Sequence, residues 1–274
     1  MTRYGGRKAV VLDGATGLGL AVAKRLVEGG ARVLLTGRAA DGELAAAAAE
    51  LGPGARVVGT GPAGACASPD ALASVVEDAL GTVDFVFVHA GTTGPADEGV
   101  APAWGTCRAV RALLPSVHDD GAIVFTAAAL PALAVDRAPD GDAPDGDAPD
   151  GDAPDRDVPY REPEPGPWAC ARALAAELAG RGIRVNAVAP GLIALPGGGG
   201  AAGRVAERRV PMRRPGTVDE VARAALFLAA EATYTTGAEL AVDGGLGPGG
   251  PELPDGGARK GHPAAARPPR ADPP

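Results

Sequence analysis

A glycine-rich turn near the start of the chain is the first stretch whose residue types suit a defined chemistry. Gly14, Gly17 and Gly19 give the pattern G-x-x-G-x-G within "LDGATGLGLAVAKRL". Glycines leave no side chain between backbone N–H groups and an approaching pyrophosphate, and the helix that follows points the positive end of its dipole at the same place. The pattern predicts a nucleotide phosphate site at Gly14, Thr16, Gly17, Leu18 and Gly19.

The residue types that could hold a metal show no ligand spacing. Cys66, Cys107 and Cys170 are widely separated and include no C-x-x-C pair, so they fit neither a disulfide framework nor a zinc site. The repeated acids in "DGD" lack the spacing of an EF-hand loop. We therefore expect no metal and no disulfide framework, which is typical of a reducing cytoplasm.

The glycine turn lies in a segment that reads as strand, turn, helix and strand. Residues 9–12 form a short apolar run, apolar residues recur at helical spacing over 20–26, glycines end the helix at 29–30, and 33–35 form the next strand. Further strands are predicted at 56–58, 83–88, 122–125, 184–187 and 239–242, and helices at 69–80, 171–179 and 218–230. This alternation predicts an α/β fold with a Rossmann-like, doubly wound parallel sheet.

Two segments break the alternation. Residues 132–167 contain "APDGDAPDGDAPDGDAPDRD" and carry a net charge of −8, as large as that of the whole chain. Residues 248–274 are rich in proline and glycine. Such compositions bury too little apolar surface to fold. We expect one domain over residues 1–247, interrupted by an acidic linker at 132–167 and followed by a disordered tail at 248–274.

Composition narrows the class of partner. The 274 residues are 46% hydrophobic, enough for a core, and the net charge of −8 disfavours binding to nucleic acid or to an anionic membrane. No apolar run approaches the roughly 18 residues that a membrane span needs, and the first residues show no signal core. We expect a soluble cytoplasmic protein whose partners are small molecules or proteins.

Four stretches together carry a family resemblance: "GATGLGLAVAKRL", "HAG", "RGIRVNAVAPGLI" and "RRPGTVDEVARAALFLAAEATYTTGAELAVDGG". They resemble the short-chain dehydrogenase/reductase family, whose members transfer hydride between NAD(P)H and a carbonyl or alcohol. The resemblance is strong over residues 7–38 and 168–246. It implies that Ala90, Gly91, Pro190 and Gly191 join the glycine turn in binding the cofactor.

The resemblance also exposes departures at the cofactor site. Asp13 stands where the family's T-G-x-x-x-G-x-G motif has its first glycine, and a shifted turn starting at Gly14 is one way to compensate. Ala65 and Leu195 replace two further cofactor contacts. Gly37 occupies the position of an NAD-preferring acid, and Arg38 follows it. Because a guanidinium can pair with a 2′-phosphate, we expect NADP(H) rather than NAD(H).

The catalytic positions depart further. Counting back from the late helix puts Tyr160 at the family's catalytic tyrosine, but Glu164 stands in place of the lysine and Ala128 in place of the serine. A carboxylate raises the pKa of a nearby phenol, the reverse of the lysine's effect. No asparagine lies between Gly91 and Gly121, where the family's fourth group belongs. Tyr160 is therefore interpreted as a vestigial catalytic residue.

Prolines around these positions disfavour a helix. Pro163, Pro165 and Pro167 restrict the residues before them to extended backbone, so the helix is predicted to begin near Pro167 or Trp168, beyond Tyr160. The tyrosine and the position four residues later then share no helix face.

Three functions remain open at this point. The first is a degenerate family member that binds NADP(H) without catalysis and serves as a partner of an active paralogue. The second is an active NADP(H)-dependent ketoreductase acting on a small carbonyl substrate, with His89 or Tyr160 as acid. The third is a cyclase or isomerase on the same scaffold. A homo-oligomer is compatible with each.

Overall fold

The structure is a computed structural model of the whole chain, and it describes residues 2–37, 41–60, 66, 68–89, 106–126, 167–194 and 210–246. Its strands are β1 Lys8–Leu12, β2 Arg32–Gly37, β3 Ala55–Gly59, β4 Val83–His89, β5 Val117–Thr126, β6 Arg184–Pro190, β7 Ile193–Ala194, β8 Gly216–Thr217 and β9 Glu239–Val242. Its α-helices are α1 Gly17–Glu28, α2 Asp41–Leu51, α3 Pro69–Leu80, α4 Thr106–Leu113, α5 Pro167–Leu178 and α7 Val218–Ala230, with 3₁₀ turns at Gly52–Gly54 and Ala179–Arg181.

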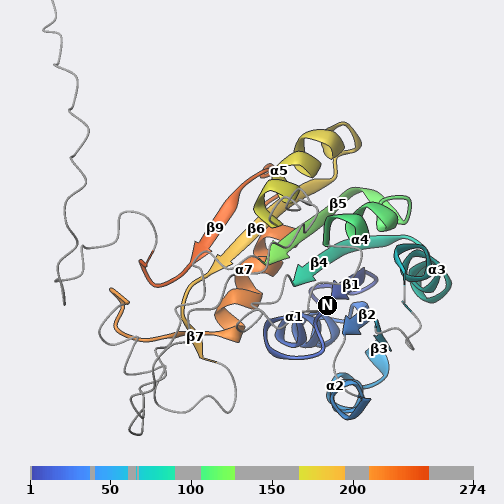
Figure 1. Cartoon of the computed structure of the whole chain (residues 1–274), viewed down its shortest axis with the longest axis horizontal. Helices are drawn as coiled ribbons and strands as arrows, with labels where there is room; N and C mark the ends of the chain where they lie inside the picture. Colours follow the sequence, from blue (N-terminus) through green and yellow to red (C-terminus); the bar gives the residue numbers. More distant parts are fainter. Residues whose placement is uncertain are drawn as a thin grey trace, which may run out of the picture.

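Seven parallel strands form the central sheet in the order β3-β2-β1-β4-β5-β6-β9, while β7 and β8 pair separately (Figure 1). From β1 the chain first proceeds to β2 and β3 on one side, and then to β4, β5, β6 and β9 on the other. The connection therefore reverses between β1 and β4, which are neighbours in the sheet. This is the doubly wound, Rossmann-like arrangement that the alternating pattern predicts.

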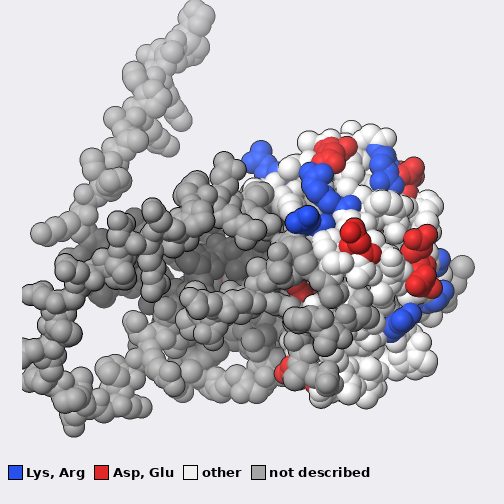
Figure 2. All heavy atoms as spheres, turned by 45° about the vertical axis from the view of Figure 1, so that its right-hand side comes forward, with Lys and Arg blue, Asp and Glu red and all other residues white. Residues whose placement is uncertain are grey.

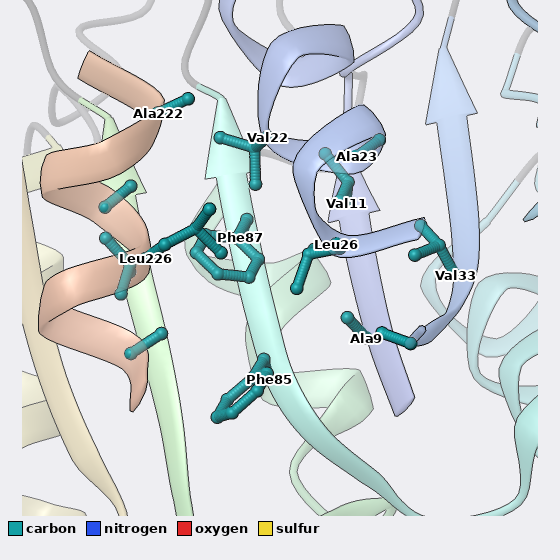
Figure 3. Close-up of a cluster of buried hydrophobic side chains, with 14 of the residues drawn as sticks. Ala9, Val11, Val22, Ala23, Leu26, Val33, Phe85, Phe87, Ala222 and Leu226 are labelled. Atoms are coloured by element: carbon teal, nitrogen blue, oxygen red, sulfur yellow. The ribbon is translucent and has the colours of Figure 1, made fainter. Parts of the chain in front are cut away.

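Alternating residues of each strand supply two separate apolar cores. Ala9 and Val11 of β1 face the core covered by α1, α2 and α7, whereas Val10 and Leu12 face the core covered by α3, α4 and α5. Figure 3 shows the first of these cores, where Leu26 of α1 approaches Phe87 of β4. Both faces of the sheet are thus covered, as a parallel sheet requires.

Local signals in the sequence explain several helix ends. Ser68 precedes α3, and its hydroxyl accepts a hydrogen bond from the Ala71 N–H at 3.1 Å. Thr217 and Glu220 form a reciprocal capping box at the start of α7. Helix α5 begins at Pro167, one of the two starting residues predicted, because proline fits the first helical position.

Some elements differ from the sequence expectations. Strand β5 begins at Val117, five residues before the expected start, and its register against β4 shifts between Val83 and Phe85. The sequence does not predict this extension, because His118, Asp119 and Asp120 are all polar and exposed and so lack the alternation of apolar and polar residues that marks a strand. Helix α2 and the short strands β7 and β8 were also not among the predicted elements.

The cysteine expectation was wrong. Cys107 in α4 and Cys170 in α5 form a disulfide, with their Cα atoms 6.0 Å apart, while Cys66 is free and buried. The two cysteines are 63 residues apart in the sequence. Their pairing follows from the packing of α4 and α5 on the same face of the sheet, which spacing along the chain cannot reveal.

On the surface shown in Figure 2, basic and acidic side chains of the described residues are interspersed. Each of the ion pairs among the described residues joins two partly or fully exposed side chains, for example Lys24 with Glu50. No helix in the described part of the chain combines the length and hydropathy that crossing a bilayer demands.

Candidate functional site

The carboxyl ends of the parallel strands gather at one edge of the sheet. Leu12 of β1 pairs with Val88 of β4, His89 with Thr126 of β5, and Thr126 with Val188 of β6. In doubly wound sheets ligands bind outside this edge, at the point where the strand order reverses. That point lies here between β1 and β4, so the glycine turn after β1 borders the expected crevice.

Asp13 adopts a backbone conformation that normally belongs to glycine. Its φ is 53°, in the left-handed region. Aspartate enters this region more readily than most residues, although at some cost in free energy. Asp13 is thus the residue after β1 that takes the left-handed conformation, and the shift of the motif to Gly14 stays a prediction.

Hydrogen bonds to Thr36 fix this turn against β2. The Asp13 N–H donates to the Thr36 hydroxyl at 3.2 Å, and the Gly14 N–H donates to the Thr36 carbonyl at 2.8 Å. Thr36 is almost fully buried. Sequence reasoning did not select this residue, although a hydroxyl at the end of an apolar strand, in "VLLTG", is a detectable signal. Thr36 therefore anchors the turn through both its backbone and its side chain.

Gly14 and Gly19 bring α1 into direct contact with the turn. A Cβ on Gly19 would lie 2.2 Å from the Gly14 Cα, and a Cβ on Gly14 would lie 2.5 Å from the Val11 side chain. Gly17 opens the helix with a φ of 57°, another left-handed value. These three glycines are therefore required by the shape of the turn, as their spacing predicts.

The start of α1 lacks a capping side chain at its N-cap residue. Thr16, the N-cap, is exposed and its side chain makes no capping hydrogen bond, and the first turn contains no acidic residue. Leu18 instead points into the core, where it is 8% exposed. Thr16 and Leu18 thus contribute backbone position rather than side-chain contact. The unpaired N–H groups of a helix start favour an anion.

Pro190 ends β6 at the same edge, and Gly191 follows it. The Gly191 N–H donates to the Val242 carbonyl at 3.0 Å, and a Cβ on Gly191 would lie 2.7 Å from the Asp243 Cα. The turn after β6 therefore packs directly on the turn after β9. As in the turn after β1, glycine is needed because two backbones meet.

His89 ends β4 beside Thr126. Its Nδ1 is one of two buried side-chain atoms without a hydrogen-bond partner in the described part of the chain, the other being the Thr60 hydroxyl. Burial lowers the pKa of His89 from its ordinary value. The ring is therefore held neutral near pH 7, at an edge where a proton could be exchanged.

Asn186, the only asparagine in the chain, has a structural role. It is fully buried in β6, where its Nδ2 donates to the Thr235 carbonyl at 2.8 Å and its Oδ1 accepts from the Ala238 N–H at 3.0 Å. Both ends of the amide are thus used to hold β6 to the chain before β9. Asn186 is not available to relay protons.

Several predicted site residues lie outside the described residues: Arg38, Ala65, Ala90, Gly91, Ala128, Tyr160, Glu164 and Leu195. Among the residues that are described, no group of three or more His, Cys, Asp or Glu side chains could hold a metal ion. The described site therefore consists of backbone turns at the ends of β1, β2, β6 and β9, with His89 between them.

A doubly wound parallel sheet with a glycine turn at its reversal point is the Rossmann-like architecture. Two family models match this chain: one described as short chain dehydrogenase over residues 7–137, and one described as Enoyl-(Acyl carrier protein) reductase over residues 167–247. The chain belongs to the short-chain dehydrogenase/reductase family.

Curated relatives cover nearly the whole chain. Oxidoreductase asL5 of Sarocladium schorii is 32% identical over 251 residues, which span 89% of this chain and 97% of that protein. Glucose 1-dehydrogenase of Gluconobacter oxydans is 31% identical, spanning 89% of this chain and 93% of the relative. Dehydrogenase and reductase relatives agree with an oxidoreductase fold.

Solved structures give the same fold. L-Sorbose reductase from Gluconobacter frateurii, complexed with NADPH and L-sorbose, is 26% identical with a TM-score of 0.62, covering 90% of this chain and 98% of that one. An apo short-chain oxidoreductase from Pseudomonas aeruginosa PAO1, described as containing an atypical catalytic center, is 26% identical with a TM-score of 0.63, covering 88% and 97%.

Proposed function

We propose that this chain is a short-chain dehydrogenase/reductase that binds NADP(H) but lacks the family's proton-transfer groups, and that it works as a non-catalytic or strongly atypical member. One observation carries the binding part of the proposal. Asp13 stands at the position of the motif's first glycine and adopts a left-handed backbone, with a φ of 53°, which glycine adopts most readily. Phosphate binding at such a turn depends on backbone N–H groups rather than on side chains.

The residues at the edge fit a dinucleotide. The N–H groups of Gly17 and Leu18 would face the pyrophosphate, Gly14 would leave room for it beside the turn, and Pro190 and Gly191 would border the opposite side of the crevice. Arg38 would pair with the 2′-phosphate and so select NADP(H). When bound, the nicotinamide supplies or accepts a hydride. The L-sorbose reductase complexed with NADPH supports this choice of cofactor by similarity.

The catalytic part of the proposal rests on the residues at the family's four positions. Ala128 has no hydrogen-bond donor for a developing oxyanion, and Glu164 would oppose ionisation of Tyr160. No asparagine lies between Gly91 and Gly121, where the family's fourth group belongs, and Asn186 of β6 uses both ends of its amide in structural hydrogen bonds. A protein of this kind would act as a regulatory partner, for example of an active paralogue.

Calorimetry with NADPH and NADH tests the binding proposal. We expect NADPH to bind more tightly than NADH, and Arg38→Ala to remove the difference while leaving NADH affinity unchanged. Absence of binding at millimolar NADPH would contradict the proposal.

For the catalytic part, NADPH consumption is followed with a panel of ketones and quinones, and Tyr160→Phe serves as the control. Turnover that depends on Tyr160 would show that the tyrosine still works as an acid.

A second function is favoured by His89. Its buried Nδ1 has no partner among the described residues, and a neutral ring at the edge of the sheet suits a proton acceptor in an NADP(H)-dependent oxidoreductase that interconverts a small carbonyl compound and its alcohol. Turnover lost in His89→Ala but kept in Tyr160→Phe would support this alternative. Turnover absent from the wild-type protein, with NADPH bound, would instead support the non-catalytic function.

A further inference from the structure

The disulfide between Cys107 and Cys170 lies where two helices begin. Cys107 is the second residue of α4, and Cys170 is the fourth residue of α5. Cys170 is 2% exposed and packs in the core under α3, α4 and α5, while Cys107 is half-buried at the margin of the same core. One sulfur of the pair is thus within reach of solvent, and the other is not.

The position of both cysteines favours thiolate chemistry. Each lies in the first turn of a helix, where unpaired backbone N–H groups stabilise a thiolate relative to a thiol. Arginines occur near both cysteines, Arg108 and Arg111 in α4 and Arg172 in α5. The third cysteine lies outside any helix and is fully buried, and burial raises the pKa of the Cys66 thiol.

Two further links hold α4 and α5 together without the disulfide. Both guanidinium Nη atoms of Arg111 donate to the carboxylate of Glu177, at 3.0 and 2.8 Å. Arg181, just after α5, donates to the carbonyls of Leu114 and Val117 at 3.0 and 2.7 Å. These contacts lie farther along both helices than the cysteines do. They would keep the two thiols close to each other after reduction.

We propose that Cys107 and Cys170 form a reversible thiol–disulfide site that is oxidised and reduced by small-molecule disulfides and thiols of the glutathione class. The thiolate of the half-buried Cys107 attacks one sulfur of oxidised glutathione and releases the first glutathione thiolate. The Cys170 thiolate then attacks the Cys107 sulfur of the mixed disulfide and releases the second. Two cysteine thiols are oxidised, one glutathione disulfide is reduced to two thiols, and the two cysteine protons end on the released thiolates.

Formation of the disulfide should change the stability of the fold. The bond joins the start of α4 to the start of α5 across 63 residues of sequence. A cross-link over a loop of this length reduces the conformational entropy of the unfolded chain. For a domain of this size we expect the oxidised form to melt about 5–10 °C above the reduced form.

The test uses the full-length protein in buffers of varying ratio between reduced and oxidised glutathione. Free thiols are trapped by alkylation and counted by intact mass, the disulfide is located by peptide mapping, and the melting temperature is measured at each ratio. We expect the count to fall from three thiols to one, the remaining thiol to be Cys66, and the melting temperature to rise in parallel. Cys66→Ala should show the same transition with one thiol fewer.

Cys107→Ser is the matched variant, because its hydroxyl replaces a half-buried sulfur with little change in volume. It should show neither the intramolecular bond nor the rise in melting temperature. Three results with the wild-type protein would overturn the proposal: a pair that stays reduced at every ratio, a bond that resists excess reduced glutathione in the folded protein, or a bond between two chains. Since reduction of the wild-type protein needs no substitution, a misfolded variant cannot obscure the outcome.

Discussion

The carboxyl edge of the sheet contains two regions that differ in how they are held. At the ends of β1 and β2, the Asp13 and Gly14 N–H groups both bond to Thr36, and Gly14 contacts Gly19 directly. At the ends of β4 and β5, the Nδ1 atom of His89 is buried without a partner among the described residues. The first region is held mainly through backbone groups, whereas the second depends on the chemistry of a side chain.

Under the proposed function, this difference would explain how nucleotide binding is kept in a fold that has lost its proton-transfer groups. A turn made of backbone hydrogen bonds tolerates the exchange of a glycine for Asp13, because aspartate can follow the same path. A proton-transfer group cannot be exchanged in this way. The methyl group of Ala128 cannot do the chemistry of the family's serine, and the carboxylate of Glu164 cannot do that of its lysine. Nucleotide binding is accordingly the more durable property.

The largest expected effect comes from breaking the backbone region at Gly19. In Gly19→Ala the new Cβ would lie 2.2 Å from the Gly14 Cα, so α1 must move away from the turn. We expect a loss of about 2–3 kcal/mol in the free energy of unfolding, measured in urea, together with loss of NADPH binding by calorimetry.

Gly42→Ala in α2 is the matched control for this change. A Cβ on Gly42 would meet nothing within 4 Å. Alanine should therefore raise stability by up to about 1 kcal/mol through its higher helix propensity, and nucleotide affinity should not change. Equal effects of the two substitutions would refute the role of the Gly14–Gly19 contact.

Removing the charge of Asp13 should have the next largest effect, and it concerns nucleotide affinity. Asp13→Asn keeps a residue that tolerates the left-handed region but takes a negative charge away from the proposed pyrophosphate position. If the two charges are about 6 Å apart at a dielectric constant of about 40, between those of water and of a protein surface, their repulsion is about 1.4 kcal/mol, or about tenfold in affinity. Calorimetry should show a correspondingly lower Kd for NADPH.

Asp13→Ala separates charge from conformation. It removes the charge as well, but alanine is less tolerant of positive φ, so we expect a stability loss of about 1 kcal/mol. An unchanged Kd in Asp13→Asn would mean that the dinucleotide does not approach this turn.

His89 gives a smaller, pH-dependent effect in the side-chain region. Because burial lowers its pKa in the folded state, the unfolded chain binds more protons than the folded chain as the pH falls below about 6.5. Stability should therefore decrease towards acid, by at most about 1.4 kcal/mol per pH unit from this residue. Urea unfolding at pH 7 and pH 5 should show a weaker dependence in His89→Asn. Identical profiles would assign the acid sensitivity to other groups.

The smallest effect is expected away from the edge, at Glu220. Its hydrogen bonds with Arg214, and with the Thr217 backbone, lower the pKa of its carboxyl to about 2. The stabilisation is present above the ordinary pKa of the carboxyl and is lost as the pH falls towards 2. Because the Glu220 side chain is partly exposed and its partner Arg214 is exposed, Glu220→Gln should lower the melting temperature only slightly at pH 7, and the two proteins should converge in strong acid. NADPH affinity should be unaffected.

Most of the architecture could be predicted because its signals are local. Apolar runs locate the sheet, and Pro167 sets the start of α5. Helix α2 escaped prediction because its alanine-rich sequence has little contrast between apolar and polar faces. The early start of β5 escaped because the exposed His118, Asp119 and Asp120 hide a strand that pairs with β4 through an irregular register.

At the candidate site, the sequence locates the glycine turn but does not reveal its conformation. The spacing of Gly14, Gly17 and Gly19 marks the turn, yet only the structure shows that Asp13 adopts the left-handed conformation and that Thr36 holds it. The pairing of Cys107 with Cys170 is likewise a product of tertiary packing. The roles of Arg38 and Tyr160 stay predictions, since both lie outside the described residues.

The pairing of β5 with β6 has a practical consequence for the chain as a whole. These strands lie on either side of residues 127–166, and they pair from Ala122 with Arg184 to Thr126 with Val188. One fragment would contain α4 and β5, and the other would contain α5 and β6. Because β5 pairs with β6 and α4 contacts α5, the two fragments need no peptide link through the intervening segment. The protein should therefore reassemble when produced as two separate fragments divided within that segment, which would make it usable as a split reporter.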